Sequence, residues 1–230
     1  MKYRWLPIML VLLAVPAALF GQSKEEQRLQ ESATVMREIL GMPEGIPQNI
    51  LNKAACVVVF PSVKKFAIGI GGSYGRGAIT CRSGKDFRGP WSAPAMFGLE
   101  AANIGLQLGG QATDFVLLVM NEKGGDSVMS SKVKLGTDAA AAAGPKGRDT
   151  SASTDVVMKA EILSYSRSRG LFGGISLEGS TLRSDDGANK KVYGKDLSTK
   201  QIVREGAVQP TAGGKELISV LGQKSPKRVQ

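Results

Sequence analysis

The sequence contains no histidine among its 230 residues. Without histidine a protein cannot build a Ser-His-Asp triad, a histidine general base or the common His-containing zinc sites. The carboxylates do not replace that chemistry, because their spacing matches neither a metal loop nor an acid–base pair; those considered are Asp114, Asp138, Asp149 and Asp155. We therefore expect no enzymatic activity, no catalytic or metal-binding residues and no cofactor.

Nucleotide-binding and nucleic-acid-binding motifs are missing as well. Gly69-Ile-Gly71 is followed by Tyr74 where a dinucleotide fingerprint needs its third glycine, and no Gly-Lys-Ser/Thr follows. Aromatic residues make up only 6% of the chain. The net charge of +10 is distributed over the whole chain, which favours weak attraction to anionic surfaces. We expect no sequence-specific nucleic-acid binding.

Cysteine is scarce, with Cys56 and Cys81 as the only two. In an oxidising compartment they could form a disulfide, because each is expected at the end of a strand and those strands could be neighbours. Alternatively, each cysteine fills space in an apolar core as a free thiol. The sequence leaves both interpretations open.

Long apolar runs are absent except at the N-terminus. Lys2 and Arg4 precede an apolar run from Leu6 to Phe20, which is short for a membrane span of about 20 residues. Residues 1–21 are therefore predicted to be a signal peptide, with an uncleaved anchor helix as the alternative. In either case the domain is expected to be exported, to the periplasm or as a secreted protein.

The remaining pattern predicts an α+β fold, with N-terminal helices packed on a glycine-rich, largely antiparallel β structure. Ser23 and Glu26 form a capping box for a first helix, and Pro47 opens a second one. Cys56–Phe60 is predicted to be a buried strand that ends at Pro61. Residues 185–189 are interpreted as a turn that leads into residues 190–193, and residues 198–230 as a short helix and a flexible basic tail.

The most informative stretch runs from Leu163 to Gly179 and is typical of a β-hairpin. Its turn contains Arg167 and Arg169 beside the apolar pair Leu171 and Phe172. Guanidinium groups next to large apolar side chains suit an anionic surface with an apolar layer beneath. The alternative is that Leu171 and Phe172 fold into the core and the arginines are solvated. Further basic loop candidates are Lys64, Lys65 and Arg148.

Several segments together resemble the SYLF domain family. They are Ala54-Ala-Cys-Val-Val-Val-Phe-Pro61, Gly69-Ile-Gly-Gly-Ser-Tyr-Gly-Arg-Gly77, Trp91-Ser-Ala-Pro94, Gly109-Gly-Gln-Ala-Thr-Asp-Phe115, Ala143-Gly-Pro-Lys-Gly-Arg148 and Tyr165-Ser-Arg-Ser-Arg-Gly-Leu-Phe-Gly-Gly-Ile-Ser-Leu-Glu-Gly179. They stand in the family's order, and the resemblance places the domain at residues 22–197.

The resemblance implies a non-enzymatic lipid-binding domain, in a family also described as actin-binding in fungi. The expected partner is an anionic phospholipid or membrane surface, contacted through basic and apolar loops. Because the leader looks bacterial, actin is not expected as a partner. The alternative is a structural or protein-interaction module of the cell envelope that binds no small ligand.

Overall fold

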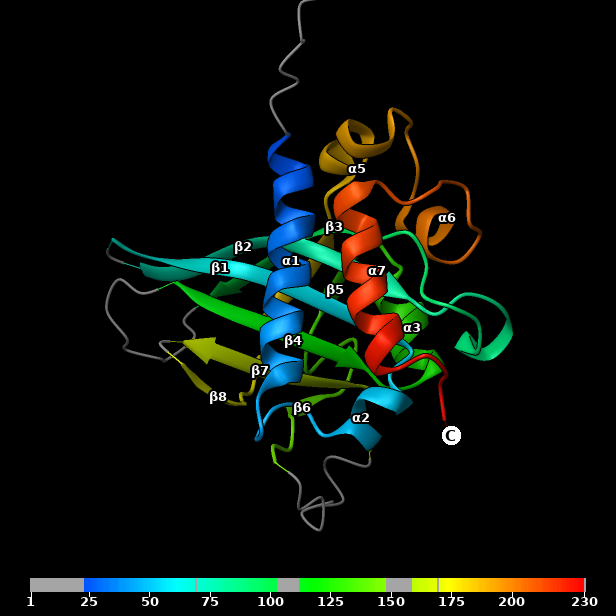
Figure 1. Ribbon diagram of the computed structural model, residues 1–230. Coiled ribbons are helices and arrows are strands. Elements are labelled where there is room, and N and C mark those ends of the chain that lie inside the picture. The colour runs from blue at the N-terminus through cyan, green and yellow to red at the C-terminus, as the bar shows by residue number, and fades with distance from the viewer. Residues whose placement is uncertain (1–22, 69, 103–111, 148–158, 169, 230) are drawn as a thin grey trace, which may run out of the picture.

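The computed structural model describes residues 23–68, 70–102, 112–147, 159–168 and 170–229. Within them, nine strands form one curled sheet in the order β5-β9-β3-β2-β1-β4-β7-β6, with β8 paired to β7 (Figure 1). All of these pairs are antiparallel except β6–β7. The strands are β1 (Cys56–Ile68), β2 (Ile70–Cys81), β3 (Ala95–Ala102), β4 (Thr113–Val119), β5 (Lys132–Lys134), β6 (Ala141–Ala143), β7 (Ile162–Ser168), β8 (Leu171–Gly174) and β9 (Thr181–Ser184).

Two long helices lie side by side across one face of the sheet, which we call its outer face (Figure 1). They are α1 (Lys24–Gly41) and α7 (Ala212–Lys224). The shorter helices are α2 (Gln48–Lys53), η1 (Lys85–Phe87), α3 (Glu122–Val128), α5 (Asp186–Tyr193) and α6 (Thr199–Val203). The predicted α+β class, with a largely antiparallel sheet, is confirmed. No helix in these segments has the length and apolar composition needed to cross a bilayer.

The alternation of side chains along each strand produces two separate cores. Val57 and Val59 point to the outer face, where they belong to the same cluster as Leu29 of α1 and Leu217 of α7. Val58 and Phe60, which alternate with them on β1, point to the inner face and belong to a second cluster inside the curl. Both faces of this central strand are therefore buried, which explains its continuous β-branched run.

The first helix begins as its capping pattern predicts. Ser23 accepts a hydrogen bond from the backbone N–H of Glu26, 3.1 Å away. The carboxylate of Glu26 turns toward α7 instead of closing the box, and accepts from the N–H of Gly213. A Cβ at Gly213 would lie only 2.9 Å from the carbonyl oxygen of Glu26, so this glycine allows α1 and α7 to pack closely.

Three predictions about the elements are wrong. Strand β1 does not end at Pro61 but continues to Ile68 through a register shift between Phe60 and Val63. Proline is tolerated there because such irregularities leave ladder positions unpaired. The predicted turn at residues 185–189 is instead the start of helix α5, whose N-cap Asp185 accepts from the N–H of Ala188. The supposed flexible tail contains α7, whose Leu217 and Leu221 are fully buried.

Candidate functional site

The turns of the β1–β2 and β7–β8 hairpins lie at the same end of the sheet, which we call the turn end (Figure 1). There the strand register places Lys64 of β1 opposite Tyr74 of β2. On the other side of β1, Asp114 of β4 is opposite Arg167, which in turn is opposite Phe172. The sheet thus places three of the predicted contact residues at the same end, although Lys64 is about 100 positions away from the other two in the chain.

Arg167 does not lie in an exposed turn as predicted. It is on β7, its side chain is 16% exposed, and its guanidinium binds the carboxylates of Asp114 at 2.7 Å and of Glu38 on α1. Burial lowers the pKa of Arg167, but the hydrogen bonds to and negative charges of Glu38 and Asp114 raise it by more, so the pKa is raised overall. Asp114 also accepts from the backbone N–H of Ser62 at the irregularity in β1. Arg167 therefore joins α1 to three strands, and its charge is already compensated.

The two apolar residues of the hairpin behave differently. Leu171 is 79% exposed, the largest exposed fraction among the large hydrophobic residues described. Phe172 is partly buried and stacks on Tyr165, with ring centroids 5.4 Å apart and 9° between the planes. Burial raises the pKa of Tyr165. Phe172 therefore anchors β8 to the sheet, while Leu171 projects into solvent.

Lys64 is exposed, and no ion pair joins it to any described residue. Beside it, Tyr74 is 40% exposed and its hydroxyl accepts from Nε of Arg76 at 2.8 Å. Sequence reasoning missed Tyr74 and Arg76 as surface residues. The available signal was their alternation with Gly75 and Gly77, which places both side chains on one face of β2.

Three of the predicted contact residues cannot be placed as side chains. Arg148 and Arg169 lie outside the described residues, and of Lys65 only the backbone, on β1, is described. The predicted signal peptide, residues 1–21, also lies outside the described residues.

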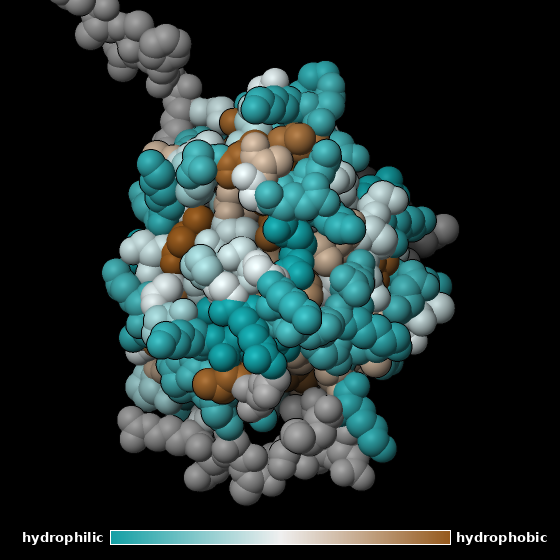
Figure 2. Space-filling view, turned by 90° about the vertical axis from the view of Figure 1, so that its right-hand side faces the viewer, coloured by the Kyte–Doolittle hydropathy of each residue, from teal (hydrophilic) through white to brown (hydrophobic). Residues whose placement is uncertain are grey.

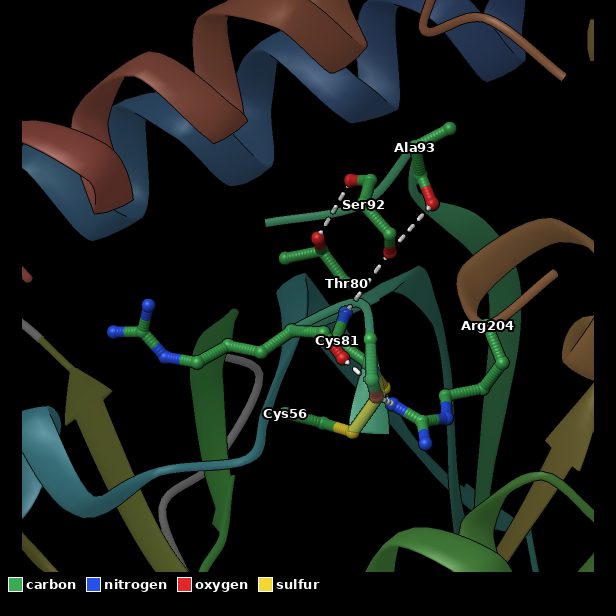
Figure 3. The surroundings of a disulfide bond; sticks show 8 residues. Cys56, Thr80, Cys81, Ser92, Ala93 and Arg204 are labelled. Carbon is green, nitrogen blue, oxygen red and sulfur yellow. Dashed lines mark hydrogen bonds between the residues drawn. A yellow bond between two sulfur atoms is a disulfide. The ribbon is translucent and has the colours of Figure 1, made fainter. Parts of the chain in front are cut away.

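The opposite end of the sheet contains a disulfide between Cys56 and Cys81, and we call it the disulfide end (Figure 3). The two residues are direct partners in the β1–β2 register. The N–H of Arg82 donates to the carbonyl of Ala55, so the cysteines occupy a non-hydrogen-bonded pair, where the strands approach most closely. Arg204 extends from α6 toward this end and donates to the carbonyl oxygens of Arg82 and Gly84.

Two further arginines at the disulfide end bind backbone carbonyls. Arg82 is fully buried, lies over the ring of Trp91 and donates to Ser225 at the end of α7. Burial, with the nearby charge of Arg228, lowers its pKa to about 10. Arg228 donates to the carbonyls of Lys53, Asp86 and Met120. These arginines fix the C-terminal segment to the sheet, and we assign them a structural role.

The surface on this side of the molecule is mainly hydrophilic, with several smaller apolar areas (Figure 2). An open depression of about 360 Å³ beside Arg228 mixes cations and an amide with carboxylates; it is lined by Asp86, Arg88, Asn121, Glu122 and Lys123. No group of three potential metal ligands occurs in the described segments. The turn end is therefore the better candidate for a functional site.

Comparisons with known proteins identify relatives of this chain. A family profile described as Ysc84, Las17-binding protein actin regulator, matches residues 100–224. An SH3 domain-containing protein of Schizosaccharomyces pombe is 33% identical over 202 residues, covering 86% of this chain and 46% of the relative. LAS seventeen-binding protein 3 of Saccharomyces cerevisiae is 30% identical over 213 residues, covering 90% of this chain and 45% of the relative.

A vertebrate protein is similar to this chain over nearly its whole length. The SH3 domain-containing YSC84-like protein 1 of Rattus norvegicus is 28% identical over 214 residues, covering 93% of this chain and 62% of the relative. The chain spans less than half of the length of the two fungal relatives.

Proposed function

The chain belongs to the Ysc84 (SYLF) family, and from that premise we propose that it is a non-enzymatic domain that binds anionic lipid surfaces through its turn end. The proposal rests on two residues at the turn end. Leu171 is 79% exposed at the tip of the β7–β8 hairpin, and Lys64 on the β1–β2 hairpin forms no ion pair with any described residue. An apolar side chain can enter the boundary between headgroups and acyl chains, and a lysine is attracted to the anionic headgroups.

This proposal differs from the expectation based on sequence in the role of Arg167. Because Asp114 and Glu38 already bind its guanidinium, Arg167 has little charge to offer a membrane. Its contribution is to hold the hairpin that presents Leu171. Leu171 and Lys64 remain proposed contacts, together with Lys65, Arg148 and Arg169, whereas Phe172 holds β8 to the sheet.

The proposal is tested with Leu171→Asp and vesicle co-sedimentation. Wild type should bind phosphatidylglycerol vesicles and bind phosphatidylcholine vesicles weakly. Complete burial of a leucine is worth about 1.5–3 kcal/mol, so the variant should lose roughly tenfold or more in affinity. Val229→Asp is the matched control, because Val229 is also exposed, at 47%, but lies at the C-terminus near the disulfide end. Equal affinity of L171D and wild type would contradict the proposed contact.

A second candidate function follows from the family's description, which names Las17 binding and actin regulation. In this case the domain would be a protein-interaction module that binds no lipid. The two candidates differ in one result: wild type that binds neither vesicle type would favour the interaction module.

We also propose that the domain is exported. The support is the predicted leader, residues 1–21, and N-terminal sequencing of the mature protein tests it. A mature chain that begins near Gln22 is the expected result. An intact Met1 in all of the protein, recovered from the cytosolic fraction, would contradict export.

A further inference from the structure

The outer face of the sheet carries positively charged residues beyond the two hairpins. On β5, β9 and β3, the apolar residues Val133, Leu182 and Leu99 belong to the inner core. Their neighbours along each strand therefore point to the outer face. These neighbours include Lys132 and Lys134 on β5 and Arg183 on β9.

The strand register arranges these side chains in two adjacent rows. One row crosses four strands from Lys132 through Arg183 and Gly98 to Arg76. The next row crosses five strands from Lys134 through Thr181, Glu100 and Tyr74 to Lys64. Since neighbouring strands lie about 4.8 Å apart, the second row extends over roughly 19 Å. We call the five cations of these rows the basic sheet face: Lys64, Arg76, Lys132, Lys134 and Arg183.

Most of the positive charge on this face is not compensated. Arg183 pairs with Glu100 at 3.2 Å, and Arg76 lies 3.4 Å from Asp185, with about half of each arginine side chain exposed. The three lysines are exposed and have no ion-pair partner in the described part of the chain. Asp138 lies close to Lys134 but accepts from its backbone N–H, at 2.7 Å.

We infer that the basic sheet face is a second part of the lipid-contact surface, which continues from Lys64 across β2, β3 and β9 to β5. This inference rests on the proposed function and adds residues to the contact surface. A protein interface normally has an apolar centre with aromatic anchors. The two rows instead contain five long cationic side chains and one aromatic residue, Tyr74, which suits the many equivalent phosphate groups of a fluid anionic bilayer.

The inference is tested with Lys132→Gln/Lys134→Gln in the full chain. Its control is Lys200→Gln/Lys215→Gln, which removes two exposed lysines from α6 and α7. With vesicles of 30% phosphatidylglycerol in phosphatidylcholine, K132Q/K134Q is expected to lose about tenfold to thirtyfold in affinity. The reason is that each lysine near an anionic surface contributes about 1 kcal/mol of binding free energy. The control should bind within about twofold of wild type, and its affinity should keep the wild-type salt dependence.

The outcomes separate this inference from the proposed function. If wild type does not bind the vesicles, the proposed function fails. If wild type binds and L171D does not, but K132Q/K134Q binds like the control, only the inference is overturned. Thermal unfolding of K132Q/K134Q should match wild type, since both side chains are exposed. If that variant is destabilised, Lys132→Arg/Lys134→Arg, which keeps the charge, must restore binding, and failure to do so overturns the inference.

Discussion

Two glycines on β2 are required by packing, and a third on β3 is not. A Cβ at Gly77 would overlap the carbonyl oxygen of Val59, and one at Gly75 would overlap the side chain of Val63. At Gly98, by contrast, nothing lies closer than 3.9 Å to such an atom. The glycine-rich face that the sequence shows between Gly69 and Gly77 is thus explained, at these two positions, by the close approach of β1.

This difference predicts the effects of two alanine substitutions. Gly77→Ala should destabilise the protein by about 1–3 kcal/mol, because the added methyl group displaces the backbone of β1. Gly98→Ala introduces the same atom where space exists, and its free energy of unfolding should be close to that of wild type. Urea denaturation of the two variants measures both values, and equal destabilisation would contradict the packing argument.

Arg167 is predicted to be important for stability. Arg167→Ala leaves the partly buried carboxylate of Asp114 without its cation, and each hydrogen bond between charged groups contributes about 1.5–3 kcal/mol. We expect a loss of about that size in urea denaturation. Arg183→Ala is the matched control, because it removes an exposed arginine that pairs with Glu100 and should cost less than about 1 kcal/mol. Similar losses in the two variants would show that Arg167 contributes no more than a surface ion pair.

The residue types near the turns identified candidate contact residues, but they did not predict which of those side chains are exposed. The exposed Leu171 and Lys64 were both named from the sequence, because apolar and basic residues near a turn stand out there. The burial of Arg167 could not be foreseen, since it depends on Glu38 and Asp114, which are 129 and 53 positions away. Tyr74 and Arg76 were overlooked, although their alternation with Gly75 and Gly77 is visible in the sequence.

At the scale of elements, local sequence signals were sufficient to predict a helix or strand where a capping pattern or a β-branched run lies within that element. The capping pattern at Ser23 and the β-branched run of β1 both correspond to observed elements. The C-terminal segment was misjudged because its composition of proline, glycine and lysine resembles a flexible tail. What orders α7 is tertiary: its contact with α1 and the hydrogen bonds from Arg82 to Ser225.

The packing of α7 predicts a clear difference between two neighbouring positions. Leu217 is fully buried in the outer core, so Leu217→Ala should cost about 2–5 kcal/mol. Lys215, two residues earlier on the same helix, is exposed, and Lys215→Ala should change stability by less than about 0.5 kcal/mol. Thermal or chemical unfolding distinguishes these results. A flexible tail would make both substitutions neutral.

The whole molecule separates stabilising and binding features between its two ends. The disulfide end contains the covalent link and the arginines that hold the C-terminal segment. The turn end presents Leu171 and Lys64. Lys64 is eight residues beyond Cys56 on β1, which corresponds to roughly 26 Å along the strand. Changes at one end should therefore have little direct effect on the other.

Reduction of the disulfide tests this separation. The link joins residues 25 positions apart, and closing such a loop stabilises a fold by about 3 kcal/mol in the chain-entropy model. A reducing agent should therefore lower the urea midpoint of wild type, while Cys56→Ala/Cys81→Ala should not respond to it. Below the unfolding transition, reduced wild type should still bind anionic vesicles with its original affinity, because Leu171 and Lys64 keep their positions. Loss of binding on reduction would show that the two ends are coupled, and two reactive thiols in unreduced, unfolded protein would show that the link had not formed.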